Sequence, residues 1–184
     1  MPGKVFFVTG TSSGFGHELV QVVLERGDYA VATSRHAVAL SFAGATNKNL
    51  LAVDLDVTKR ETVHAAFQRA IDKFGRVDVV VNNAGFGLAG AFETLGEDQM
   101  RMQMEINFFG LLNVTRRAME VMRETKSGGL IQQVTSIGGL RGVPTFSIYC
   151  ASFFNDTATT EIYTRRHTLS LHDALPIWDM GSFR

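Results

Sequence analysis

The sequence predicts an α/β fold built on a doubly wound parallel sheet. Short apolar runs of strand length alternate with longer segments of helical period, which is the pattern of successive β-α-β units. Gly27 and Gly75 follow two of the helical segments, at the position where glycine commonly ends a helix. Because crossovers between parallel strands are right-handed, the favoured strand order is 3-2-1-4-5.

The expected elements follow one another in regular order. Strands are expected over residues 4–9, 29–33, 50–54, 77–82 and 130–135, and helices over residues 16–26, 58–74 and 98–125. Residues 34–48 are expected to form a weak helix and a loop. In the first helix, Leu19, Val22 and Val23 should face the core. Thr58 and Glu61 have the spacing of a capping box at the start of the second helix.

Composition favours small-molecule partners over nucleic acids and membranes. Lys and Arg together number 18, as do Asp and Glu, so the formal net charge is zero. A neutral protein does not attract nucleic acids or anionic membranes over long distances. Cys150 is the single cysteine, so no disulfide can form within the chain and a reducing compartment is compatible. The N-terminal segment lacks the features of a signal peptide, and the apolar runs are too short to span a bilayer. We therefore expect a soluble cytoplasmic protein.

A glycine-rich loop joins the first expected strand to the first expected helix. The loop reads Thr9-Gly10-Thr11-Ser12-Ser13-Gly14-Phe15-Gly16. Gly10 allows a tight turn, Gly14 lets the backbone approach a pyrophosphate, and Gly16 allows close packing of the helix. The helix N-terminus adds unpaired N–H donors and positive potential. The loop predicts a dinucleotide site in a Rossmann-like fold; the alternative is a glycine-rich turn without a ligand.

The end of the second expected strand bears on which dinucleotide is bound. An acidic residue there would bind the ribose hydroxyls of NAD, but this sequence has Thr33, Ser34 and Arg35. A cation at Arg35, together with Ser12 in the loop, suits the 2′-phosphate of NADP. We therefore expect NADP(H) in preference to NAD(H). The alternative is that Arg35 is a solvated loop arginine.

Together, the motifs resemble those of the short-chain dehydrogenase/reductase family over residues 4–152. They are the glycine loop followed in order by Asp56-Val57, Asn82-Asn83-Ala84-Gly85, Asn107, Ser136 and Tyr149. The resemblance implies a hydride transfer between a nicotinamide cofactor and an alcohol or carbonyl substrate, and a parent protein that forms homo-oligomers. It also implies a longer fold than this sequence holds, which here would be truncated after the fifth strand and leave Ile131 and Val134 on an edge strand. We expect instability or aggregation from such an edge.

The resemblance also assigns roles to individual residues. Asp56 would bind the adenine amine and Val57 would pack on the adenine ring, while Asn83, Ala84 and Gly85 would line the cofactor. Tyr149 would exchange a proton with the substrate oxygen. Ser136 would donate a hydrogen bond to that oxygen, and Asn107 would hold a water of the proton relay. Taken singly, each of these residues also has an ordinary structural explanation, such as a turn or a strand-end cap.

The family pattern Tyr-x-x-x-Lys is broken, because Phe153 stands where the lysine belongs. A cation about 4 Å from the phenolate is worth about 4 kcal/mol at an effective dielectric constant of 20. In the family the same lysine also binds the nicotinamide ribose. The chain as written is therefore expected to have little or no activity.

The C-terminal segment differs from the rest of the sequence. Residues 155–177 lack a hydrophobic period and resemble the conceptual translation of a common DNA-sequencing adapter, with Arg165-Arg166-His167 as the variable insert. We expect residues 1–152 to form the NADP-binding domain with most of the catalytic residues, and residues 153–184 to be a non-native tail. A natural but divergent C-terminus is the alternative. No metal site is expected from the scattered histidines.

Three interpretations of the whole chain remain open at this stage. The first is an oxidoreductase whose natural gene continues past Ser152 with a lysine at position 153. The second is a catalytically dead dinucleotide-binding module, which the substitution at Phe153 supports. The third is a misassembled reading frame without a function.

Overall fold

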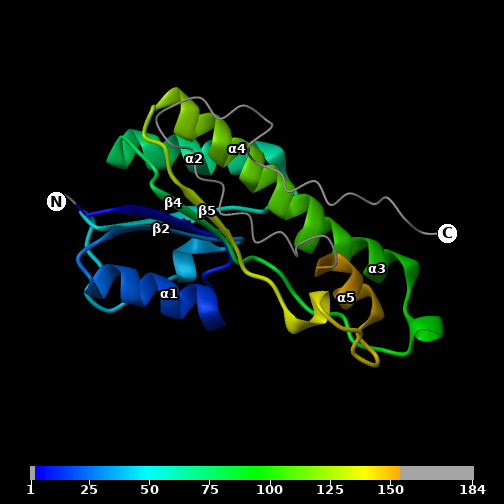
Figure 1. The fold of residues 1–184 in the computed structure, drawn as a ribbon. Helices are drawn as coiled ribbons and strands as arrows, with labels where there is room; N and C mark the ends of the chain where they lie inside the picture. The colour runs from blue at the N-terminus through cyan, green and yellow to red at the C-terminus, as the bar shows by residue number, and fades with distance from the viewer. Residues whose placement is uncertain (1–2, 154–184) are drawn as a thin grey trace.

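A computed structural model describes residues 3–153, and these residues form a parallel sheet with helices on both faces (Figure 1). The strand order is β3-β2-β1-β4-β5, as predicted, and every neighbouring pair of strands is parallel. The strands are β1 (Val5–Val8), β2 (Tyr29–Ser34), β3 (Leu50–Asp54), β4 (Val79–Asn82) and β5 (Leu130–Gln133). The helices are α1 (Gly14–Glu25), α2 (Arg60–Phe74), α3 (Glu97–Met104), α4 (Leu111–Glu124) and α5 (Ser147–Phe153).

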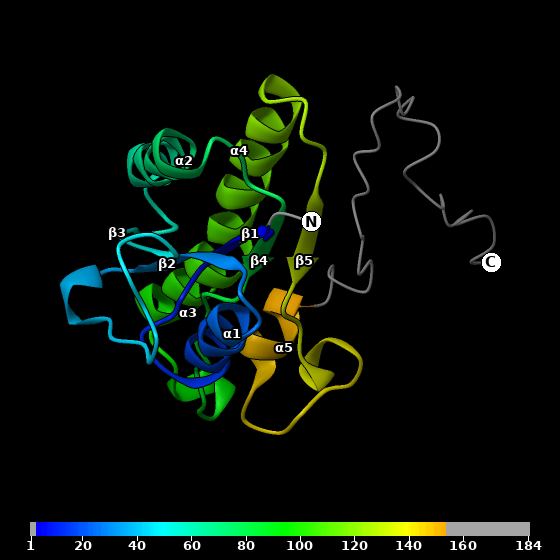
Figure 2. The same cartoon turned by 90° about the vertical axis from the view of Figure 1, so that its left-hand side faces the viewer.

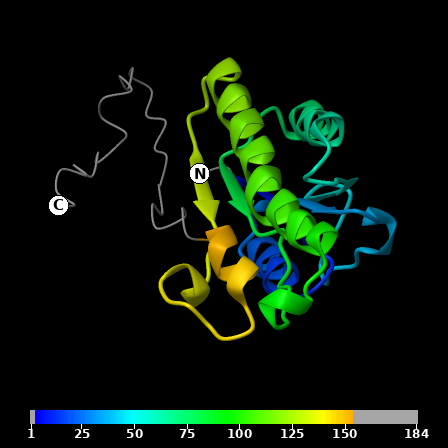
Figure 3. The same ribbon diagram turned by 90° about the vertical axis from the view of Figure 1, so that its right-hand side faces the viewer.

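One face of the sheet is covered by α2 and α4, which lie side by side in Figures 1 and 3. Phe7 pairs in register with Val31 of β2 and Val80 of β4, and Val80 pairs with Ile131 of β5. Side chains alternate between the faces of a sheet, so a row in register presents one apolar stripe to the helices. All four side chains are fully buried in the larger core cluster, where Phe7 stacks on Phe67 of α2 with 4.1 Å between ring centroids.

The opposite face is covered by α1 (Figure 2). Val8 and its neighbours in register, Ala32 and Val81, form the smaller core cluster with Val20, Val23 and Leu24 of α1. The expectation that Val22 faces the core is wrong, because its side chain is 47% exposed. The helix begins at Gly14 and its buried stripe runs through residues 16, 20, 23 and 24. Val23 is buried and Leu19 packs partly buried against the same cluster, so Val22 alone of the three predicted residues was misplaced.

The predicted capping box of the second helix does not form. The helix α2 begins at Arg60, with Lys59 as its N-cap and no side-chain cap. The Thr58 hydroxyl instead donates to Asp56 Oδ1 at 2.7 Å, and the Thr58 backbone N–H donates to the same oxygen at 3.0 Å. Thr58 is thus part of a turn that follows β3. Gly75 does end the helix, in the left-handed conformation with φ of 73°.

The single long helix predicted over residues 98–125 is interrupted in its middle. Between α3 and α4 the segment Glu105–Gly110 forms a π-helical turn, so the helical column continues but its register shifts (Figure 3). A Cβ atom at Gly110 would lie 2.5 Å from Val57 Cγ2, so only glycine fits here. π-Turns inside helices frequently occur at functional sites.

Strand β5 is an edge of the sheet among the described residues, as expected. Ile131 is fully buried beneath the helices, whereas Val134, directly after the strand, is 39% exposed. Within residues 3–153 no helix is long and apolar enough to cross a membrane. The adapter-like segment 155–177 lies outside the described residues.

Candidate active site

A cavity of about 840 Å³ lies at the carboxyl ends of the strands, where open α/β sheets bind ligands. It extends from the ends of β2 and β3, past the glycine loop, to the ends of β4 and β5 and to α5. Most of the predicted site residues line it: Gly10, Ser12, Ser13, Phe15, Arg35, Asp56, Val57, Asn83, Ala84, Gly85, Asn107 and Tyr149. Gly14, Gly16 and Ser136 are not among its lining residues.

Glycine is required at the three positions of the loop for different physical reasons. Gly10 has a positive φ of 69°, and a Cβ there would lie 2.8 Å from Ala84 Cα. Gly14 also has a positive φ, of 58°, but open space surrounds it. A Cβ at Gly16 would lie 2.4 Å from both the Gly10 carbonyl oxygen and Asn83 Nδ2. Gly10 and Gly16 thus allow the loop to pack against the segment after β4, while Gly14 permits a backbone angle.

Hydrogen bonds fasten the loop to the neighbouring strand ends. The Thr9 hydroxyl accepts from the backbone N–H groups of Asn83 and Ala84 at 2.9 and 3.0 Å. The Asn83 side-chain amide donates to the Thr9 and Gly10 carbonyls, both at 2.9 Å. The Thr11 hydroxyl donates to the Thr33 carbonyl at 3.1 Å. Sequence reasoning did not assign these roles to Thr9 and Thr11, although two threonines flanking the first glycine were a usable signal.

Arg35 follows β2 and borders the cavity with an exposed side chain. A carboxylate does lie nearby, because Ser34 pairs in register with Asp54 of β3. Asp54 Oδ1 accepts the Ala37 backbone N–H at 2.6 Å, and Asp54 does not line the cavity. The acid therefore holds the turn after β2, and Arg35 is the charged side chain that β2 and its following turn present to the cavity.

Asp56 and Val57 both line the cavity and both have structural partners. The Asp56 carboxylate accepts two hydrogen bonds from Thr58 and lies 3.9 Å from Lys59 Nζ. Val57 is 7% exposed and packs against the π-turn at Gly110. Asp56 thus stabilises the turn after β3, and its side chain is 29% exposed, which leaves room for a contact to a ligand.

Asn107 lies in the π-turn and is 4% exposed. Its side chain accepts from the Phe86 N–H at 3.0 Å and donates to the Phe86 carbonyl at 2.9 Å. It also donates to the Ser152 hydroxyl at 3.2 Å, which joins the π-turn to α5. Asn107 therefore holds the segment after β4 in place, a role that sequence reasoning did not foresee.

Tyr149 projects from α5 among aromatic side chains. Its ring makes edge-to-face contacts with Phe146 and Phe153, with centroids 5.6 and 4.9 Å apart. Phe153, at the position of the family lysine, lines the same cavity, so an apolar ring stands beside the phenol where a cation was expected. Ser136 begins a short 3-10 turn and its hydroxyl accepts the Gly138 N–H at 3.1 Å. The Tyr149 ring lies against that turn, 3.3 Å from a Cβ placed at Gly138.

Comparison with known families identifies the chain. A family described as short chain dehydrogenase matches residues 4–161. The chain belongs to the short-chain dehydrogenase family. The resemblance drawn from the motifs and the predicted fold class are thereby confirmed.

Individual relatives agree with this membership. An uncharacterised oxidoreductase of Schizosaccharomyces pombe is 41% identical over 147 residues, which cover 80% of this chain and 49% of the relative. A 3-ketoacyl-(acyl-carrier-protein) reductase from Brucella melitensis, solved with NADH, matches with a TM-score of 0.79 and 30% identity over 86% of this chain and 67% of that one. A short chain dehydrogenase from Burkholderia cenocepacia, solved with NADP, matches with a TM-score of 0.75 and 31% identity over 86% and 64%. The chain spans about half the length of the curated relatives it matches.

No group of three or more His, Cys, Asp or Glu side chains within residues 3–153 is arranged to hold a metal ion. The lining of the cavity combines glycines, amides, hydroxyls and aromatic rings with aliphatic side chains and with two charged residues, Arg35 and Asp56.

Proposed function

We propose that this chain derives from an NADP(H)-dependent oxidoreductase that interconverts alcohols and carbonyl compounds in the cytoplasm. The observation that carries the proposal is that Arg35, the glycine loop and Tyr149 border one continuous cavity. The order of strands spreads these groups along the cavity, with Arg35 near β2 and β3 and Tyr149 beyond β4.

The start of α1 fits a pyrophosphate. Its N-cap residue, Ser13, makes no side-chain cap, and the first turn of the helix carries no acidic residue. The free N–H groups and the positive end of the helix dipole are therefore available to an anion. Ser12 and Ser13 line the cavity at this point and add hydroxyl donors.

The nicotinamide, when bound, supplies or accepts the hydride. Tyr149 would exchange the accompanying proton with the substrate oxygen. Ser136 does not itself line the cavity but directly follows Thr135, which does; its hydroxyl oxygen accepts from Gly138, so its proton would be available to the same substrate oxygen. Asn107 would act by holding the segment after β4 through its hydrogen bonds to Phe86.

Phe153 makes the 184-residue chain a poor catalyst in this proposal. A phenyl ring cannot stabilise the phenolate of Tyr149 or bind the ribose hydroxyls, which a lysine could do. Turnover should therefore be negligible. Phe153→Lys should restore part of the affinity for cofactor but little turnover, since the chain spans only about half the length of its curated relatives.

Cofactor binding tests the proposal directly. The wild-type chain should bind NADPH more tightly than NADH, because Arg35 can pair with the 2′-phosphate. Arg35→Ala should reduce that preference by roughly tenfold, as expected for losing about 1.4 kcal/mol from a charge-assisted contact. The matched control is Arg69→Ala, an exposed arginine on α2 outside the cavity. Equal dissociation constants for NADPH and NADH in the wild-type chain would remove the argument for NADP.

A second candidate function is a dinucleotide-binding module without catalysis. Phe153 favours it, because the ring packs edge-to-face on Tyr149 and so gives the substitution a defined structural place. Ordinary dehydrogenase rates from the purified chain would exclude this candidate and would also contradict the effect that we assign to Phe153. We also propose that residues 153–184 do not belong to the evolved domain, and sequencing genomic DNA across codons 152–184 would decide between a natural and a misassembled reading frame.

A further inference from the structure

A second buried amide stands one helical turn before Asn107. Gln103 is fully buried, and it is the one buried residue of α3. Its Nε2 donates to the Phe86 carbonyl, and its Oε1 accepts the Leu88 N–H at 2.6 Å. Burying an amide is unfavourable unless both of its ends are paired, and here both ends pair with the backbone of one loop.

Gln103 and Asn107 form a clamp on this loop. They lie on the same side of the helical column, because both side-chain amides donate to the Phe86 carbonyl. Asn107 pairs with both the N–H and the carbonyl of Phe86, and Gln103 pairs with the same carbonyl and with Leu88. Two amides thus hold the loop at three backbone groups, the N–H and carbonyl of Phe86 and the N–H of Leu88.

The loop that they hold is a wall of the cavity. Gly85, Phe86 and Gly87 line the cavity, whereas Gln103 does not. A Cβ at Gly87 would lie 3.5 Å from the Tyr149 ring, so the loop and the ring are in close contact. A shift of the loop would change the space beside Tyr149 and leave the Arg35 end of the cavity unaltered.

We propose that Gln103 is a positioning residue that sets the shape of the cavity beside Tyr149, acting through the backbone of residues 86–88. This inference rests on the proposed dinucleotide function. An apolar side chain of similar length would fill the same space, so packing alone does not account for a glutamine here. The two hydrogen bonds to one loop do account for it.

The test compares two ligands that occupy different parts of the cavity. NADPH would span both ends, whereas adenosine 2′,5′-bisphosphate would occupy the Arg35 end alone. Gln103→Met in the 184-residue chain should weaken binding of NADPH by roughly tenfold, the ratio that about 1.4 kcal/mol produces, and leave binding of the bisphosphate unchanged. Hydrogen exchange should quicken at the Leu88 amide more than at the Phe86 amide, because Asn107 still holds Phe86.

Two further variants make the result specific. Gln103→Asn keeps a neutral amide but shortens it by one methylene, so its hydrogen bonds to the loop should weaken and its affinity for NADPH should fall between wild type and Gln103→Met. It also replaces Gln103→Met in the comparison if the latter does not fold. Gln68→Met, on the exposed face of α2, is the matched control and should bind both ligands as wild type does.

The binding results distinguish a failure of the positioning role from a failure of the proposed dinucleotide function. A loss confined to NADPH supports the positioning role. Unchanged NADPH binding, or equal losses for both ligands, would overturn the role while leaving the proposed function standing. A wild-type chain that binds neither ligand would refute the proposed function and the positioning role together.

Discussion

Gly16 has no room for a side chain, although its backbone conformation is ordinary. A Cβ atom there would lie 2.4 Å from the Gly10 carbonyl oxygen, which is backbone and cannot rotate away, and 2.4 Å from the Asn83 amide. The same amide donates to the Thr9 and Gly10 carbonyls. A methyl group at position 16 would therefore push α1 away from the loop or break these hydrogen bonds.

We expect Gly16→Ala to destabilise the protein by about 1–3 kcal/mol, the usual cost of overpacking. Binding of NADPH should weaken as well, because the loop lines the cavity. The control is Gly142→Ala, where open space surrounds the glycine and φ is not positive, so its effect should stay within about 0.5 kcal/mol. Urea unfolding and NADPH titration measure both effects, and equal midpoints for the two variants would contradict the crowding argument.

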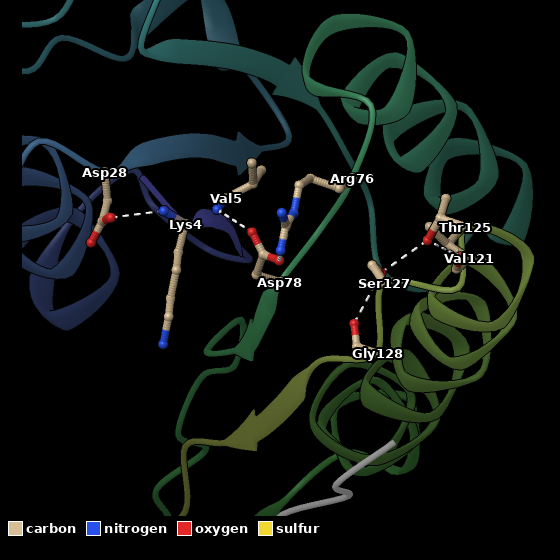
Figure 4. A network of polar contacts seen from close by, with 9 residues as sticks. All are labelled: Lys4, Val5, Asp28, Arg76, Asp78, Val121, Thr125, Ser127 and Gly128. Carbon is tan, nitrogen blue, oxygen red and sulfur yellow. Dashed lines mark hydrogen bonds and ion pairs between the residues drawn. The ribbon is translucent and has the colours of Figure 1, made fainter. Parts of the chain in front are cut away.

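At the scale of elements, a buried carboxylate joins the starts of two neighbouring strands. Asp78, just before β4, is 9% exposed, and its Oδ2 accepts the Val5 N–H at 2.8 Å (Figure 4). Arg76 pairs with the other carboxylate oxygen. The first residue of β1 thus donates its N–H to a side chain, because no neighbouring strand supplies an acceptor at this position. Lys4 N–H is satisfied in a similar way by Asp28, at 2.8 Å.

Asp78→Ala should lower the free energy of unfolding by about 1–3 kcal/mol, because it leaves the Val5 N–H buried without an acceptor. Asp78→Asn should cost less, since its amide oxygen can still accept from Val5 and only the pairing with Arg76 is lost. Thermal and urea unfolding of the two variants measure the difference. The hydrogen bond would be shown to be unimportant if both variants unfolded at the wild-type midpoint.

At the scale of the whole molecule, some parts of the structure could be predicted from the sequence and others could not. Buried parallel strands are continuous apolar runs, so strand identity and order could be predicted from the alternation with helical segments. The starts of α1 and α2 could not be placed to the residue: neither helix has a side-chain cap, and the Thr58 hydroxyl bonds Asp56 in a local turn and does not cap α2. Gln103 was missed because its partners are backbone groups of an irregular loop, which leave no pattern in the sequence.

The residues of the site also divide into those that the sequence could place and those that it could not. Residues that touch the cavity because they end a strand, such as Arg35 and Asp56, could be placed from the strand pattern. The contacts that orient Ser136 and Asn107 depend on the 3-10 turn and the π-turn, and neither turn has a period that the sequence reveals. Residues placed by strand ends and residues placed by the two turns both depend on the position of the sheet. The packing of the helices on the sheet therefore supports the whole site.

The last prediction concerns the packing of α2 on the sheet. Phe67 of α2 is fully buried and stacks on Phe7 of the central strand, with 4.1 Å between centroids and 6° between ring planes. Phe67→Ala should therefore destabilise the protein by about 3–5 kcal/mol, through lost apolar burial and a cavity between the layers. Phe92→Ala, which removes a ring that is 58% exposed, should change stability by less than about 1 kcal/mol. Urea unfolding measures both. Since β1 leads directly into the glycine loop, NADPH should also protect Phe67→Ala less than Phe92→Ala at equal ligand concentration, because weaker binding gives less stabilisation. Equal stability of the two variants would show that the helix layer does not support the sheet as the packing indicates.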